Sequence, residues 1–150
     1  RLAEWFIGAA VLRTHVLSLA AANAFAGGGF LLIGLSGLGV SMSSLTGMHL
    51  LSVGALGLAV ISVLIIAGLR HTGRPIRLPW QGHVAVIMMT AAGLVRILPE
   101  IADVPSFLGA HYLLSAALWS GAFAVWLAGF VPLLLHPLDE TASEQSARPC

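Results

Sequence analysis

The sequence predicts an all-α protein that crosses a membrane several times, and two observations lead to this class. Hydrophobic residues make up 58% of the chain and charged residues only 9%, with a mean hydropathy of +0.96. The apolar residues also gather into runs of about 20, the length that a helix needs to cross the roughly 30 Å hydrocarbon core of a bilayer. A water-soluble domain of this composition would expose much of its apolar surface, so we expect a polytopic membrane protein.

Four apolar runs are long enough to cross, and no alternating pattern typical of strands competes with them. These runs cover residues 14–38, 48–69, 80–98 and 106–135. The predicted domain plan therefore has a four-helix transmembrane domain over residues 14–138. We expect residues 1–13 to form an interfacial segment or the tail of a missing helix, and residues 139–150 to form a disordered cytoplasmic tail.

Small residues recur at positions where helices pack closely. Gly27, Gly28 and Gly29 lie in the middle of the first run, and Ala24 with Gly28 has the spacing that lets two helix backbones approach. Ala55 and Ala59 repeat this spacing in the second run. We therefore expect the four helices to pack as part of a larger helical bundle, whose other helices come from a missing part of the same protein or from partner subunits.

The arginines predict the orientation of the chain. Four crossings place both termini and the loop over residues 70–79 on one side of the bilayer, together with most of the cationic side chains: Arg1, Arg13, Arg70, Arg74, Arg77 and Arg148. The loops on the other side contain no lysine or arginine. Because positive residues are concentrated on the cytoplasmic side of membrane proteins, both termini are expected to be cytoplasmic.

This topology places two histidines near the opposite, outer face. His49 stands at the start of the second run and His111 lies early in the fourth. Two imidazoles from different helices are a common way to hold a b-type haem, and the thioether of Met42 or Met48 beside them would suit copper. The alternative is that each histidine binds a nearby carbonyl group, water or helix, since a membrane interface tolerates imidazole at little cost.

Arg96 lies at about the same depth, within one turn of the outer end of the third run. A cation at this depth needs a negative partner. A haem propionate would provide one, and so would Glu100, four residues further along the same helix. Arg96 is therefore a candidate cofactor-binding residue, with an intrahelical ion pair and snorkelling to the surface as the alternative.

A short polar motif, His71-Thr72-Gly73-Arg74-Pro75, follows the second run. Gly73 can close a helix in the left-handed conformation, Pro75 prevents its continuation, and Arg74 suits the negative helix end. This explanation leaves His71 and Thr72 without a role. The motif is therefore a candidate site of unknown role, with room for phosphate, headgroup or partner binding.

Several function classes lack support in the sequence. A formal net charge of +1 gives no basic field for nucleic acid, so nucleic-acid binding is not expected. The single cysteine is the last residue, Cys150, which excludes an internal disulfide framework. No phosphate-binding glycine loop, His-Glu-x-x-His pair or serine elbow is present, and no catalytic step is assigned.

Two of these segments together resemble a known family. The pattern His49-x-Leu-x-Val-Gly-Ala-x-Gly57, followed by the motif at residues 71–75, is similar to the carboxyl-terminal part of the NnrS proteins. The stretches over residues 94–98 and 131–135 are similar too, so the resemblance covers most of residues 45–138. Family members are much longer, which implies that this chain corresponds to their last third.

The resemblance implies a bacterial inner-membrane protein with haem and copper, linked to nitric oxide metabolism and the response to nitrosative stress, including denitrification. It carries over His49 and the motif residues His71, Thr72, Gly73 and Arg74 as site residues, whereas His111 and Arg96 rest on their depth. Two alternatives from other classes stay open. One is a membrane scaffold or assembly subunit without redox chemistry, and the other is a transporter bundle.

Overall fold

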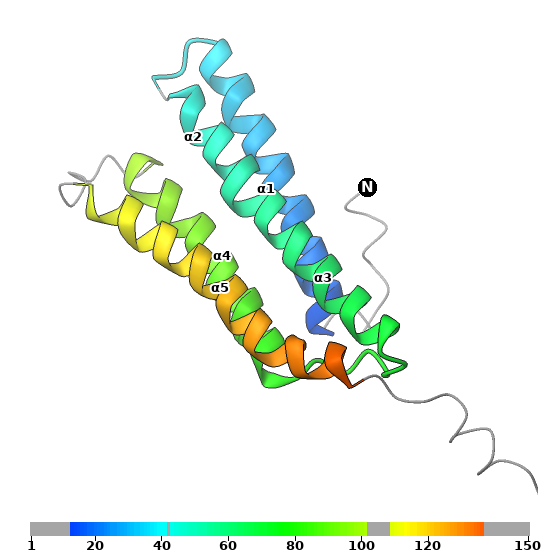
Figure 1. Cartoon of the computed structure of the whole chain (residues 1–150). Helices are drawn as coiled ribbons and strands as arrows, with labels where there is room; N and C mark the ends of the chain where they lie inside the picture. The colour runs from blue at the N-terminus through cyan, green and yellow to red at the C-terminus, as the bar shows by residue number, and fades with distance from the viewer. Residues whose placement is uncertain (1–12, 42, 102–108, 137–150) are drawn as a thin grey trace, which may run out of the picture.

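The structure is a computed structural model that describes residues 13–41, 43–101 and 109–136. Its described part is helical and contains four segments long and apolar enough to cross a membrane, as predicted. Figure 1 shows the chain running up and down between the two ends of an elongated bundle. The expected tail over residues 139–150 lies outside the described residues, as does the expected interfacial segment except for Arg13.

The first crossing is α1, Thr14–Gly37, which matches the predicted run to within one residue. It ends where Gly39 adopts the left-handed conformation, with φ 87°. Its neighbour Val40 donates its backbone N–H to the Leu35 carbonyl at 3.2 Å. This closure satisfies carbonyl groups that the end of a helix leaves without partners, so the chain can turn back within a few residues.

The second crossing, Ser44–His71, starts four residues before the predicted start at Met48 and contains three segments. They are α2, Ser44–His49; a π-helical segment, η3, Leu50–Leu56; and α3, Gly57–His71. Ser43 caps the start, because its hydroxyl accepts the backbone N–H of Leu45 at 3.2 Å. The serine and threonine before Met48 therefore begin the helix, which hydropathy alone does not indicate.

The third and fourth crossings are α4, Trp80–Ile101, and α5, Ala110–Leu135. Helix α4 continues through Pro99 and is three residues longer than predicted. Pro99 has no N–H to donate to the Val95 carbonyl, so the last turn of α4 has one hydrogen bond fewer than a regular helix. Helix α5 starts after Gly109, which has φ 83°. The predicted start of this crossing at Ser106 lies outside the described residues.

The helices pack as two hairpins, with α1 against the second crossing and α4 against α5. The shared core is formed by one stripe of α3 against α4 and α5. Its largest buried side chains are Leu58, Ile61, Ile65, Met89 and Phe130. A buried hydrogen bond also crosses the first hairpin, where the Ser62 hydroxyl lies 2.8 Å from that of Ser18.

Glycines determine how closely the helices approach. A Cβ added to Gly47 would lie 2.6 Å from the carbonyl oxygen of Gly29, and one added to Gly93 would lie 2.9 Å from the Cα of Gly54. The first contact joins α1 to α2, and the second joins α4 to η3. Gly29 therefore plays the packing role predicted for the glycine run, because only a residue without a side chain permits such backbone contact.

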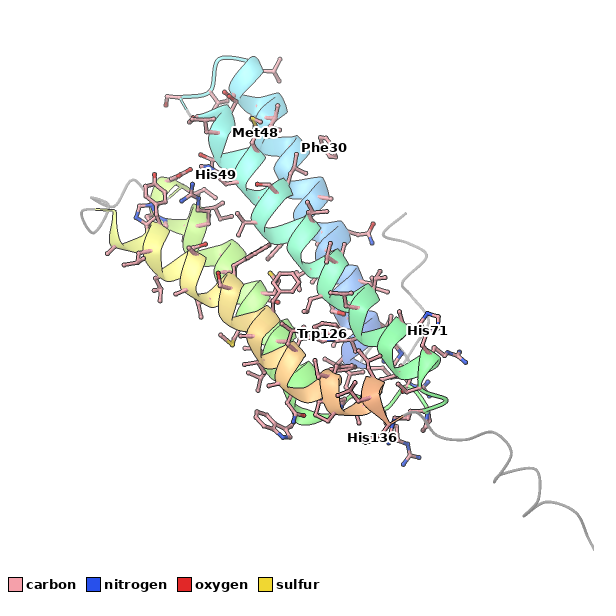
Figure 2. The ribbon with its side chains drawn as sticks, in the orientation of Figure 1. Phe30, Met48, His49, His71, Trp126 and His136 are labelled. Carbon is pink, nitrogen blue, oxygen red and sulfur yellow. The ribbon has the colours of Figure 1, made fainter. Side chains whose placement is uncertain are left out.

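Much of the outward surface is apolar. Phe30 is 67% exposed and Leu113 is 75% exposed, and Figure 2 shows Phe30 pointing away from the bundle. A water-soluble protein does not expose large side chains in such numbers along all of its helices. The four helices instead have the surface expected of segments that contact lipid chains.

Candidate functional site

The first predicted site residue, His49, lies at a change of helical winding. It is the last residue of α2, and the π-helical segment η3 begins at the next residue. π-Helical turns are rare and frequently occur at functional sites, because the extra residue in the turn redirects neighbouring side chains. The winding here directs His49 toward α4, as Figure 2 shows.

On α4, His49 meets two charged side chains. The Nη2 of Arg96 lies 2.9 Å from the Nε2 of His49, and Glu100 Oε1 lies 3.6 Å from its Nδ1. A guanidinium can only donate, so Nε2 accepts and the proton of the neutral ring stays on Nδ1, facing the carboxylate. The result is a polar chain from Arg96 through His49 to Glu100.

This chain differs from the ion pair considered for Arg96. The described ion-pair contacts join Glu100 to His49 and include none between Arg96 and Glu100. The two α4 side chains therefore reach the same imidazole from one helix face instead of pairing directly. Arg96 also lies over the ring of Tyr112 on α5, with its guanidinium carbon 4.0 Å from the ring centroid, a favourable cation–π position.

A cavity of about 310 Å³ opens beside Arg96 between η3, α4 and α5. Its polar lining comes from Arg96, Tyr112 and three serines: Ser52, Ser115 and Ser120. The Ser115 hydroxyl is already used, because it donates to the Ala92 carbonyl at 2.8 Å. Tyr112 and these serines were not predicted as site residues, since single polar residues in an apolar helix carry no sign of which way they face.

The second predicted histidine, His111, is 4% exposed. Neither of its ring nitrogens has a hydrogen-bond partner among the described residues. Its ring packs on that of Tyr112, with 3.8 Å between the centroids. Buried polar atoms are nearly always paired, so an imidazole with both nitrogens unpaired calls for an explanation.

His111 lines a second cavity, of about 470 Å³, between α4 and α5. The other lining residues are apolar: Val95, Leu98, Pro99, Ala110 and Leu114. His49 and Arg96 do not line this cavity. The structure thus places His49 and His111 at the same end of the bundle, as the topology predicts, but on different faces of α4.

Of the two methionines considered as copper ligands, the structure describes only one. Met48 is exposed, whereas Met42 lies outside the described residues. Among the residues that are described, no three His, Cys, Asp or Glu side chains gather as a metal site would require. A copper centre with three such ligands is therefore not formed by this part of the chain.

The loop motif has clear local contacts. The Thr72 hydroxyl is buried and lies 2.9 Å from the Gly68 carbonyl and 3.1 Å from that of Leu69. Gly73 has φ 69°, and Arg74 donates its backbone N–H to the Leu69 carbonyl at 2.9 Å. Thr72, for which the sequence indicated no structural role, therefore caps the carboxyl end of α3.

One arginine contact and one exposed histidine complete the description of this end of the bundle. The Arg74 guanidinium donates to the His136 carbonyl at 3.3 Å, which joins the loop to the end of α5. His71 is exposed and points outward in Figure 2. Of the motif residues, His71 is thus the one whose side chain has no contact that explains it within the described structure.

Comparison with known proteins identifies the family. The family model described as NnrS protein matches residues 1–137. The chain belongs to the NnrS family. This membership and the four helices able to cross a bilayer make it a multi-pass membrane protein of that family. No curated protein and no solved structure matches the chain.

For this NnrS protein, the match also extends the resemblance noted from the sequence. It includes the segment before residue 45, and so the whole of α1. All of the predicted site residues, from His49 to His111, fall within the matched range. All four crossings and the residues between them therefore lie within the family match.

Proposed function

We propose that this chain is a haem- or copper-associated component of nitric oxide metabolism and the nitrosative stress response, embedded in a bacterial inner membrane with both termini cytoplasmic. Membership of the NnrS family supports the link to nitric oxide. The described arginines outside Arg96 all lie at the end of the bundle away from His49, which supports this orientation through the positive-inside rule.

One observation supports a cofactor here above all others: the buried imidazole of His111, which has no hydrogen-bond partner among the described residues, lines an apolar cavity of about 470 Å³. A histidine ligand to haem iron needs a free ring nitrogen and an apolar wall for the macrocycle. A three-ligand copper site has no such support among the described residues. We therefore place haem b first and copper second.

His49 and Arg96 would bind a cofactor in a different way, because they do not line the His111 cavity. In the structure the Nε2 of His49 accepts a hydrogen bond from Arg96, so this nitrogen becomes available only when the guanidinium binds an anion instead. A haem propionate is such an anion. Arg96 would then bind the propionate and release His49 as a ligand, while Glu100 would keep the Nδ1 proton in place, as carboxylates do for metal-bound histidines.

What a bound haem would supply is redox chemistry at an iron with an exchangeable ligand position. The chain's own contribution would be to position and enclose it. His111 would supply a ligand nitrogen, Arg96 would supply a cation for a propionate, and the α4 and α5 side chains that line the His111 cavity would exclude water.

The scaffold alternative also has a specific observation in its favour. The Nε2 of His49 accepts from Arg96 at 2.9 Å, and its Nδ1 lies 3.6 Å from the Glu100 carboxylate. Two charged contacts to α4 are what a histidine that joins two helices without binding a metal would make. In that case the polar chain would connect the two hairpins of the bundle. The transporter alternative receives no comparable support from a described residue.

A spectrum tests the proposal directly. We would record reduced-minus-oxidised visible spectra and metal content for the chain purified in detergent, for His111→Ala and for His49→Ala. The control is His136→Ala, an exposed histidine at the other end of the bundle. The proposal expects haem bands that His111→Ala abolishes and the control retains.

The same measurement separates the alternatives. Full haem content in His111→Ala would exclude this histidine as a ligand. Full content in His49→Ala, with loss in His111→Ala, would leave His49 in its structural role. Absence of haem and copper from all four proteins would favour the scaffold.

A further inference from the structure

The end of the bundle away from His49 has a cavity with a different chemistry. It measures about 480 Å³ and lies where the start of α1 meets the segment between α3 and α4. Figure 1 shows these two segments at the same end of the molecule. Four of its lining residues are cationic or able to become so: Arg13, His15, Arg77 and His83.

The charge in this cavity has no negative counterpart in the described structure. None of the residues that line it is acidic. Glu100 is the one carboxylate among the described residues, and it lies at the opposite end of α4, beside His49. Two guanidinium groups that line one cavity repel each other, so an anion from outside these residues would stabilise them.

Two helices also start at this cavity. Thr14 begins α1 and Trp80 begins α4, and the first turn of each contains no acidic side chain. The first N–H groups of a helix have no partner within it, and they carry part of its positive dipole. Their field adds to that of the arginines and favours an anion in the same place.

One ring nitrogen of His83 is available to bind a ligand in this cavity. Its Nδ1 lies 3.1 Å from the Pro79 carbonyl oxygen, and because a carbonyl can only accept, Nδ1 carries a proton. The other nitrogen, Nε2, is then left for a ligand and becomes a donor when the ring is protonated. The contact with Pro79 also holds the ring at the first turn of α4.

The remaining lining indicates where the anion comes from. Ile76 and Leu78 add apolar surface to the cavity. Trp80, two residues after Leu78, is 68% exposed, as is typical of an indole at the level of lipid headgroups. We propose that this cavity binds a phosphate ester, with Arg13, His15, Arg77 and His83 as its ligands. The favoured source is the headgroup of an anionic lipid, since basic pockets between membrane helices bind such groups.

The test compares lipids that share their acyl chains. Native mass spectrometry of the detergent-purified chain would measure the binding of phosphatidylglycerol and of phosphatidylcholine. Arg13→Gln and Arg77→Gln remove one cavity cation each, and Arg70→Gln is the matched control, because Arg70 is an exposed arginine at the same end that does not line the cavity. Arg77→Lys keeps the charge and serves as a second control.

The proposal expects tighter binding of phosphatidylglycerol than of phosphatidylcholine. Each cavity variant should weaken phosphatidylglycerol binding by about fivefold, the usual effect of one cation near an anionic lipid, whereas Arg70→Gln and Arg77→Lys should change it less than twofold. Competition by inorganic phosphate or glycerol phosphate would show that the site also binds the soluble anion or its ester. Equal affinity for both lipids, or equal losses in the Arg70 and Arg77 variants, would overturn the proposal.

Discussion

Replacement of Gly93 by alanine tests how the two hairpins are held together. An added Cβ would lie 2.9 Å from the Cα of Gly54 on η3 and 3.0 Å from Cε2 of Phe25 on α1. The Phe25 ring can move, but the Gly54 backbone moves only if the helices separate. The substitution therefore acts at a point where three helices meet.

The size of the effect follows from two opposing terms. Overpacking at a tight contact costs about 1–3 kcal/mol, and alanine gains about 1 kcal/mol over glycine in helix propensity. Gly93→Ala should therefore lower the free energy of unfolding by up to about 2 kcal/mol. We would measure this by titrating the detergent-solubilised protein with a denaturing detergent and following tryptophan fluorescence.

Gly34→Ala provides the matched control. Gly34 is also a helical glycine, in α1, but an added Cβ has no atom within 4 Å. Here only the propensity gain remains, so this variant should be as stable as the wild type or more stable. If Gly93→Ala and Gly34→Ala unfold at the same denaturant concentration, the close contact between α4 and η3 does not hold the hairpins together.

Two further predictions concern polar contacts. A double-mutant cycle of Arg96→Gln and His49→Gln should give a coupling energy of about 1 kcal/mol, typical of a partly exposed charged contact in a membrane protein, and additive effects on unfolding would show that the 2.9 Å contact contributes nothing. Thr72→Val keeps the shape of a buried side chain but removes its hydroxyl from the Gly68 carbonyl. It should cost about 1 kcal/mol in the same unfolding assay, and an unchanged midpoint would exclude the hydroxyl as a cap of α3.

The four crossings could be predicted from the sequence because each is a continuous apolar run of spanning length. The start of the second crossing was placed too late, at Met48 instead of Ser44. Hydropathy does not register a helix start made of serine, leucine and threonine. The π-helical segment was not predicted either, since its residues, Leu50–Leu56, contain no charge or proline to mark the extra residue in the turn.

The end of the bundle at which His49 and His111 lie could be predicted from the sequence, but the direction in which each side chain points could not. Helix α5 is apolar on nearly all sides, so its sequence does not indicate that His111 faces α4 and lines a cavity apart from His49. Likewise, the spacing of Arg96 and Glu100 predicts a direct pair, whereas both reach the His49 imidazole. Such choices depend on the rotation of each helix about its axis, which tertiary packing decides.

The direction in which the His49 imidazole points depends on the π-helical turn that follows it. Successive residues of an α-helix are rotated by about 100° about its axis. A π-helical turn contains one residue more than an α-helical turn. If η3 became a regular α-helix while the buried side chains of α3 stayed in place, that extra residue would have to be accommodated elsewhere. Helix α2 would then rotate by about 100° relative to α3. His49 would then swing off the face that carries Arg96 and Glu100. The seven residues of η3 thus set the rotation of His49 relative to the packed core. A one-residue insertion or deletion within η3 would therefore change the direction of the His49 side chain without altering any residue that it contacts.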